Sequence, residues 1–160
     1  MPLEIERKFL LAADDWRDAI ESSERLAQGY LGGESASVRV RIGGGRAFLN
    51  IKARVRGVAR SEFEYPVPLA DAEQMLAELC LPGRIEKIRH HVRHAGVLWE
   101  IDEFLGANAG LVVAEVELDA VDAAFERPAW LGREVTDESR WYNVALAERP
   151  YAHWTAEERR

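Results

Sequence analysis

The sequence predicts an α+β domain in which an antiparallel β-barrel is accompanied by peripheral helices. Three observations lead to this class. Charged and apolar residues alternate in seven separate segments, which is the period of a strand with one buried face. Glycine-containing turns separate several of these segments at hairpin spacing. Apolar residues at helical spacing occur only in short stretches beside them.

The first part of the chain contains five expected strands and one short helix. The acidic residues at 14–15 favour a helix start, because acids stabilise the first turn, and this helix is expected to run to about residue 22. The three glycines at 43–45 are a strong hairpin signal. Pro66 and Pro68 end the fifth strand, because proline cannot donate a ladder hydrogen bond. The expected strands are residues 3–11, 25–31, 38–42, 47–54 and 60–67.

The pattern changes from strand to helix after Pro68. Apolar residues recur at helical spacing over residues 69–81, and Pro82-Gly83 ends this helix. Three further strands follow, and the first two are joined by a turn at Ala95-Gly96. They are residues 85–94, 97–104 and 111–118, and further helical segments are expected at 120–126, 138–148 and 152–160. The chain is thus expected to form one domain over residues 1–160, with the barrel at about 3–119 and a helical C-terminal segment at about 120–160.

The polar faces of the seven alternating segments carry almost only acids and bases, often in pairs of one sign. They are Glu4, Glu6 and Lys8; Arg39 and Arg41; Asn50 and Lys52; Glu62 and Glu64; Lys87 and Arg89; Glu100 and Asp102; Glu115 and Glu117. An ordinary antiparallel sheet with one solvated face is the alternative interpretation. If the sheet closes into a barrel, these residues line its lumen. The apolar faces then turn outward, and helices or a second copy of the chain in a homodimer must cover them.

The first of these segments already indicates a kind of chemistry. Glu4, Glu6 and Lys8 project to the same side of a strand. Neighbouring carboxylates repel one another unless a cation lies between them, and the ammonium in turn needs an anion nearby. This arrangement suits a metal ion that carries a polyphosphate.

Composition limits the function classes. The 160 residues fit one domain, and 48% hydrophobic with 31% charged residues is typical of a soluble globular protein. A net charge of −7 argues against an extended nucleic-acid footprint. No apolar run reaches the roughly 18 residues that span a membrane, and the start lacks the apolar core of a signal peptide. The single cysteine, Cys80, cannot form an internal disulfide, which fits the reducing cytoplasm.

The ordered motifs resemble those of the CYTH superfamily, also called triphosphate tunnel metalloenzymes. The family signature Glu-x-Glu-x-Lys is matched by Glu4, Glu6 and Lys8. The further matches, over residues 3–148, are Gln28-Gly29-Tyr30-Leu31, Arg39-x-Arg41, Lys52, Glu62-x-Glu64, Glu86-Lys87-x-Arg89, Glu100-x-Asp102 and Glu115-x-Glu117. The resemblance implies a closed eight-stranded antiparallel barrel, a tunnel with a charged lumen, and a small-molecule triphosphate inside it. It also implies dependence on Mg²⁺ or Mn²⁺, and the chain is most similar to short bacterial inorganic triphosphatases.

The same resemblance assigns roles to the charged residues. The substrate-binding cations would be Lys8, Arg39, Arg41, Lys52, Lys87 and Arg89. The metal ligands would be Glu4, Glu6, Glu62, Glu64, Asp102, Glu115 and Glu117, holding two ions by family analogy. A water activated near Glu117 would attack a terminal phosphorus. Lys87, or as a second choice Arg89, would stabilise or protonate the leaving pyrophosphate.

Two alternatives remain open at this stage. A class IV-type adenylyl cyclase, or a nucleoside or thiamine triphosphatase, would keep the barrel and change the substrate, although the sequence contains no distinct base pocket. A non-catalytic module that binds polyphosphate or nucleotide is the third possibility. The paired glutamates argue against it, because binding an anion requires cations more than carboxylates.

Overall fold

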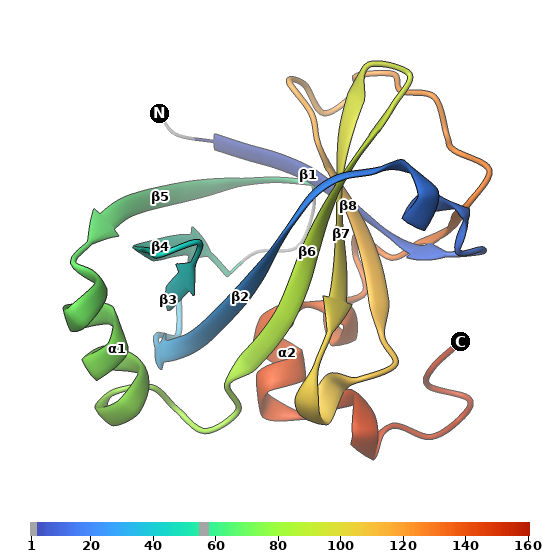
Figure 1. Ribbon diagram of the computed structural model, residues 1–160. Coiled ribbons are helices and arrows are strands. Elements are labelled where there is room, and N and C mark those ends of the chain that lie inside the picture. The colour runs from blue at the N-terminus through green and yellow to red at the C-terminus, as the bar shows by residue number, and fades with distance from the viewer. Residues whose placement is uncertain (1–2, 55–57) are drawn as a thin grey trace.

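β1 (Leu3–Leu11) is the strand on which the barrel closes (Figure 1). The computed structural model describes residues 3–54 and 58–160; residues 1–2 and 55–57 of the expected domain lie outside the described residues. β1 pairs with β5 (Ala59–Val67) through residues 3–5 and with β8 (Val112–Glu117) through residues 6–10. Between them run β4 (Arg46–Ala53), β3 (Ala36–Gly43), β2 (Ile20–Gly32), β6 (Ile85–His94) and β7 (Val97–Phe104). The predicted closed, eight-stranded antiparallel barrel is confirmed.

Two tight hairpins explain why the strand pattern was readable. β3 and β4 are joined by Gly44 and Gly45, with φ of 58° and 74°. β6 and β7 are joined by Ala95 and Gly96, with φ of 49° and 77°. Positive φ at both central residues is typical of a type I′ turn, whose twist matches that of the flanking strands. These turns fix the register that sends every second residue into the lumen.

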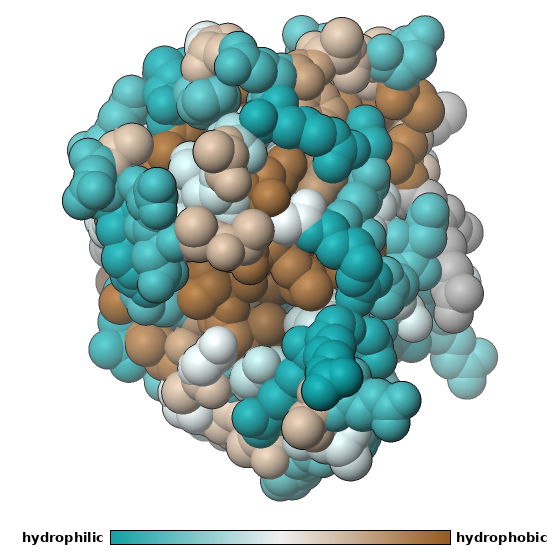
Figure 2. Space-filling view, turned by 90° about the vertical axis from the view of Figure 1, so that its right-hand side faces the viewer, coloured by the Kyte–Doolittle hydropathy of each residue, from teal (hydrophilic) through white to brown (hydrophobic). Residues whose placement is uncertain are grey.

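An aromatic cluster covers the outer face of β1, β7 and β8. Phe9 lies edge-on to Trp99 at 5.7 Å between ring centroids, and Trp99 lies edge-on to Trp130 at 5.6 Å. Trp16, from the 3₁₀ helix η1 (Asp15–Ala19), is fully buried in the same cluster. Figure 2 views the side where η1 and the loop after β8 lie, and apolar residues gather in the middle of that face between hydrophilic borders. Trp16 and Trp130, from the chain's own connecting segments, therefore cover part of this outer face.

A helix covers the outer face on the opposite side of the barrel. α1 (Leu69–Glu78) packs Ala72 against Val40 and Ala47 of β3 and β4, and Figure 1 shows it outside these strands. The outer face of β5 is less covered, because Phe63 and Tyr65 are 38% and 53% exposed.

The C-terminal segment closes one end of the barrel from inside. It contains η3 (Ser139–Trp141), α2 (Asn143–Glu148) and η4 (Tyr151–His153), and Figure 1 shows α2 against the lower end of β6 and β7. Trp141 and Leu146 pack in one buried cluster with Ile85, Phe104 and Val113. These three strand residues share a face with Lys87, Asp102 and Glu115, so the lumen changes from charged to apolar along its length.

Several expected helices differ in the structure. The helix expected at 14–22 is only the short η1, because pairing of Ile20 with Val92 already starts β2. Residues 120–126 form a bend, a turn and irregular chain rather than a helix, since Phe125 lies 6.0 Å from Phe9 and 5.6 Å from Trp99 between ring centroids. The segment that follows forms β9 (Leu131–Glu134), which was not predicted and which pairs with β1.

The expected C-terminal helices are shorter than predicted. Residues 138–148 divide into η3 and α2 at Tyr142, whose backbone is extended with φ −75° and ψ 145°. Residues 152–160 hold only the end of η4 and a turn. Tertiary packing of Trp141, Leu146 and Trp154 sets these breaks. Within the described ranges, no helix has the length and apolar character needed to cross a membrane.

Candidate active site

The barrel encloses a cavity of about 550 Å³ whose lining is mostly charged. Among the described residues, eight cationic and eight acidic side chains line it. Every site residue predicted from the sequence lies in this lining except Asp102. They are Glu4, Glu6, Lys8, Arg39, Arg41, Lys52, Glu62, Glu64, Lys87, Arg89, Glu115 and Glu117.

The strand order separates most of these charges into two walls, although Lys8 lies on β1 between the acids. We call Glu4, Glu6, Glu62, Glu64, Glu115 and Glu117 the acidic wall, because they lie on the adjacent strands β5, β1 and β8. We call Arg39, Arg41, Lys52, Lys87 and Arg89 the basic wall, on β3, β4 and β6. In a ring of eight strands, β3 lies across the lumen from β8, and β6 lies across from β5. The lumen therefore presents cations opposite carboxylates.

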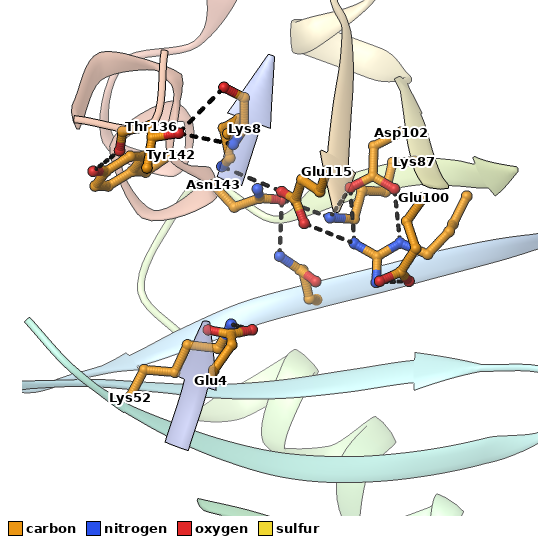
Figure 3. Close-up of polar contacts among 12 residues, drawn as sticks. Glu4, Lys8, Lys52, Lys87, Glu100, Asp102, Glu115, Thr136, Tyr142 and Asn143 are labelled. Atoms are coloured by element: carbon orange, nitrogen blue, oxygen red, sulfur yellow. Dashed lines mark hydrogen bonds and ion pairs between the residues drawn. The ribbon is translucent and has the colours of Figure 1, made fainter. Parts of the chain in front are cut away.

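Some charges are already paired across this arrangement. Lys52 Nζ lies 2.8 Å from a Glu4 oxygen, and Lys8 Nζ lies 3.3 Å from a Glu115 oxygen. Figure 3 shows Glu4 with Lys52 in one group and Glu115 near Lys87 and Asp102 in another. These ion pairs offset part of the charge on β1, β4 and β8.

Asp102 lies behind the lining rather than in it. Its side chain is 1% exposed, and its oxygens accept from Lys87 Nζ at 2.7 Å and from Arg89 Nε and Nη2 at 2.8 and 2.9 Å. Burial alone would raise the pKa of Asp102, but Arg89 and Lys87 hold it well below its usual range. The sequence indicated a metal ligand at this position. In the structure its oxygens are occupied, so it orients two cations of the basic wall.

Arg39 and Arg41 are the cations without an acid. Among the described residues, neither makes an ion pair with a carboxylate, and the buried Nε of Arg39 has no hydrogen-bond partner. Arg41 Nε donates to the Gln28 side-chain oxygen at 3.1 Å. Burial, then the nearby charges of Arg39 and Arg89, lower the pKa of Arg41 to about 10. An anion bound here would relieve both the burial cost and the repulsion.

Glu6 and Glu117 are two acids of the lining that make no ion pair within the described part of the chain. They are direct partners across the β1–β8 pairing, where like charges destabilise a sheet. Burial, followed by repulsion from Glu115 and Glu4, raises the pKa of Glu6 well above its usual value. Burial, followed by repulsion from the carboxylates of Glu4 and Glu100, also raises the pKa of Glu117. Within the described ranges, neither side chain makes an ion pair or a hydrogen bond, so a cation beside them would offset the repulsion that Glu6 and Glu117 receive from neighbouring acids.

The donor set fits a hard divalent cation. Carboxylate oxygens are the ligands that Mg²⁺ and Mn²⁺ prefer, and the repulsion at Glu6 is what such an ion would offset. In the part of the chain that the structure describes, no three acidic, histidine or cysteine side chains are already gathered into a metal cluster. Water molecules or phosphate oxygens would complete the coordination, because Mg²⁺ usually keeps several waters.

The sequence interpretation missed part of the lining. Arg60 shares its strand face with Glu62 and Glu64, and that alternation could have revealed it. Tyr142 and Asn143 also line the cavity, but they come from the C-terminal segment. Their place depends on how that segment folds back into the barrel, and no strand periodicity indicates it.

The fold and the site together define a closed antiparallel barrel whose lumen is built for a polyanion and its cations. The sequence model of the CYTH domain matches residues 2–151, and the chain belongs to this family. An inorganic triphosphatase of Acetivibrio thermocellus is 39% identical, covering 96% of this chain and 99% of its own. An inorganic triphosphatase of Nitrosomonas europaea is 38% identical, covering 90% and 96%. The crystal structure of an inorganic triphosphatase aligns with a TM-score of 0.67 at 35% identity, covering 92% of this chain and 95% of that one.

Proposed function

We propose that this chain hydrolyses inorganic tripolyphosphate to pyrophosphate and phosphate, as a triphosphatase dependent on Mg²⁺ or Mn²⁺. The proposal rests above all on the opposed unpaired charges: Arg39 and Arg41 on one side of the lumen, Glu6 and Glu117 on the other. It is supported by two relatives that are inorganic triphosphatases over nearly the whole chain.

The charge balance of the cavity favours a particular form of the substrate. Eight cations and eight acids in the described lining leave it nearly neutral overall. A bare polyphosphate would bring several uncompensated negative charges into a confined space, and a bare metal ion would bring the opposite. A triphosphate complex with two divalent ions nearly cancels its own charge and matches both walls, with phosphate oxygens at the basic wall and the cations at the acidic wall.

The binding roles follow from the chemistry of each side chain. Arg39 and Arg41 offer planar forks that can each hold two phosphate oxygens, whereas Lys8 and Lys52 act as point charges. Two divalent ions, held by carboxylates of the acidic wall, would offset phosphate charge and lower the pKa of water when bound. Asp102 is not among those carboxylates in this proposal, because it holds Lys87 and Arg89.

The chain's own groups can move the protons of the hydrolysis. A water oxygen forms a bond to the terminal phosphorus while the bridging P–O bond breaks. Glu117, whose pKa is raised, takes the proton that the water loses. Burial lowers the pKa of Lys87 to about 7, with Asp102 opposing the shift, so Lys87 can protonate the leaving pyrophosphate oxygen near neutral pH. The pKa of Arg89 is instead raised well above its usual value, which makes it a binding group rather than an acid.

Two further expectations belong to this proposal. A cytoplasmic location rests on the single cysteine, Cys80. The homodimer stays a prediction, for which exposed Phe63 and Tyr65 on β5 offer the least covered strand face.

Turnover assays test the function directly. The purified protein is incubated with tripolyphosphate, ATP or thiamine triphosphate, each with Mg²⁺, with Mn²⁺ and with EDTA. Phosphate release from tripolyphosphate that requires the metal supports the proposal. Faster turnover of ATP or thiamine triphosphate would change the substrate, and cyclic AMP from ATP would make the protein a cyclase. Binding without turnover of any substrate would leave a non-catalytic module.

A further inference from the structure

Two buried amide side chains connect the C-terminal segment to the basic wall. Gln28, on β2, is fully buried, and Asn143, the first residue of α2, is 8% exposed. We call them the amide pair. Buried amides are costly unless their polar atoms are hydrogen-bonded, so their partners are informative.

The partners fix the orientation of both amides. The Asn143 side-chain oxygen accepts from Lys87 Nζ at 2.9 Å and from Gln28 Nε2 at 3.1 Å. The Gln28 side-chain oxygen accepts from Arg41 Nε at 3.1 Å. Lysine and arginine can only donate, so both amide oxygens must face these cations, and the Gln28 amino group must face Asn143. No other assignment satisfies the set.

This chain of bonds limits what Lys87 and Arg41 can do next. The Lys87 ammonium has three N–H donors; Asp102 and Asn143 take one each, which leaves one for a ligand in the cavity. Figure 3 shows Lys87 lying between Asp102 and Asn143. Gln28 occupies Arg41 Nε, which leaves the two terminal amino groups of the guanidinium as the free, bidentate edge.

We propose that Asn143 and Gln28 are positioning residues for the hydrolysis, Asn143 acting through Lys87 and Gln28 acting through Arg41. This inference rests on the proposed function. The C-terminal segment thereby becomes part of the active site and does more than fill the end of the barrel. The two residues have separable effects, because Lys87 serves the leaving group and Arg41 binds phosphate.

Near-isosteric substitutions test the inference with tripolyphosphate and metal. Asn143→Leu keeps the side-chain volume and removes the acceptor, and it should lower kcat on the order of 100-fold with a smaller change in KM. Gln28→Met should mainly raise KM. Asn143→Asp keeps an acceptor for both Lys87 and Gln28 and should recover part of the kcat that Asn143→Leu loses.

Asn108→Leu is the matched control. Asn108 is 3% exposed, and its oxygen accepts from the Tyr151 backbone N–H at 2.8 Å, which anchors the same C-terminal segment without lining the cavity. It should lower the melting temperature and leave kcat and KM unchanged. If Asn143→Leu also lowers only the melting temperature, or if Asn143→Asp is no more active than Asn143→Leu, the inference is wrong. If wild type itself does not hydrolyse tripolyphosphate, the proposed function fails and the inference fails with it.

Discussion

Among the basic-wall residues, Arg41 should contribute most directly to substrate binding. It is buried, lacks a carboxylate partner among the described residues and keeps its terminal amino groups free. Hydrogen bonds to charged groups contribute about 1.5–3 kcal/mol, so Arg41→Ala should raise KM for tripolyphosphate about 10- to 100-fold. Arg41→Lys should be intermediate, because it keeps the charge and loses the fork. Steady-state kinetics at saturating Mg²⁺ measures both.

Arg25 provides the control for this series. It lies on β2, the strand that pairs with the β3 strand of Arg41, and its side chain is 66% exposed, with Glu86 at 3.5 Å. Arg25→Ala removes the same charge outside the lumen and should leave KM unchanged. Equal KM values for wild type and Arg41→Ala would remove Arg41 from the binding site.

Glu6 should be required for activity and unfavourable for stability. Burial, repulsion from Glu115 and then from Glu4 raise its pKa, while Lys52 and Lys8 offset only part of the effect. Glu6→Gln removes a metal donor and should abolish turnover. The same change removes the buried charge, so without metal the variant should melt at a higher temperature than wild type near neutral pH.

The pH dependence of this difference has a definite sign. A carboxyl group whose pKa is higher in the folded state binds its proton more tightly there. Its stabilising contribution is therefore complete below the unfolded pKa and is lost as pH rises through the folded one. In EDTA, the advantage of Glu6→Gln over wild type should be absent at acidic pH and grow as pH rises past about 4.5. An advantage that shrinks with rising pH would contradict the assignment.

At the scale of single elements, the β6–β7 hairpin contains a correctable strain. Ala95 has φ 49°, a left-handed conformation that costs a residue with a Cβ about 1 kcal/mol or more. Asparagine tolerates this conformation and is favoured in type I′ turns. Ala95→Asn should therefore raise the free energy of unfolding by about 0.5–1 kcal/mol without affecting activity. Urea denaturation measures the change.

Ala109 is the comparison residue for the hairpin. It is also exposed, but its φ of −56° and ψ of 140° suit any residue. Ala109→Asn should change the unfolding free energy by less than about 0.5 kcal/mol. If both variants gave the same gain, the backbone conformation of Ala95 would not be the cause.

The elements that could be predicted were those specified by a pattern of neighbouring residues in the sequence. Strands 85–94 and 97–104 were readable because alternation and an Ala-Gly turn act over a few residues. The prediction of a helix at 120–126 was wrong because Phe125 packs against Phe9 and Trp99, partners that no local pattern specifies. β9 was missed for the same reason, since its four residues become a strand only by pairing with β1.

At the scale of the whole molecule, the site is more predictable than the helices that surround it. The lumen residues follow from strand alternation, so Glu4, Arg41 and Glu117 could be placed together once the sheet closes. Depth along the lumen does not follow from alternation. Asp102 has the same pattern as its neighbours and yet lies behind Lys87 and Arg89, and Asn143 reaches the cavity only because the C-terminal segment folds into the barrel.

That segment should unfold together with the barrel. Trp154 is 6% exposed, lies edge-on to Trp141 at 4.9 Å between ring centroids, and shares a buried cluster with Ile85 of β6. Trp154→Ala removes a large buried ring and should lower the unfolding free energy by about 3–5 kcal/mol. Val121→Ala, at a side chain 54% exposed, should change it by less than about 0.5 kcal/mol.

Near-UV circular dichroism, which follows tryptophan packing, and far-UV circular dichroism, which follows the strands, should give one shared midpoint in wild type and in Trp154→Ala. Two separated midpoints in wild type would make the C-terminal segment an independent unit, and Asn143 could not then hold Lys87 as firmly as the buried strands do.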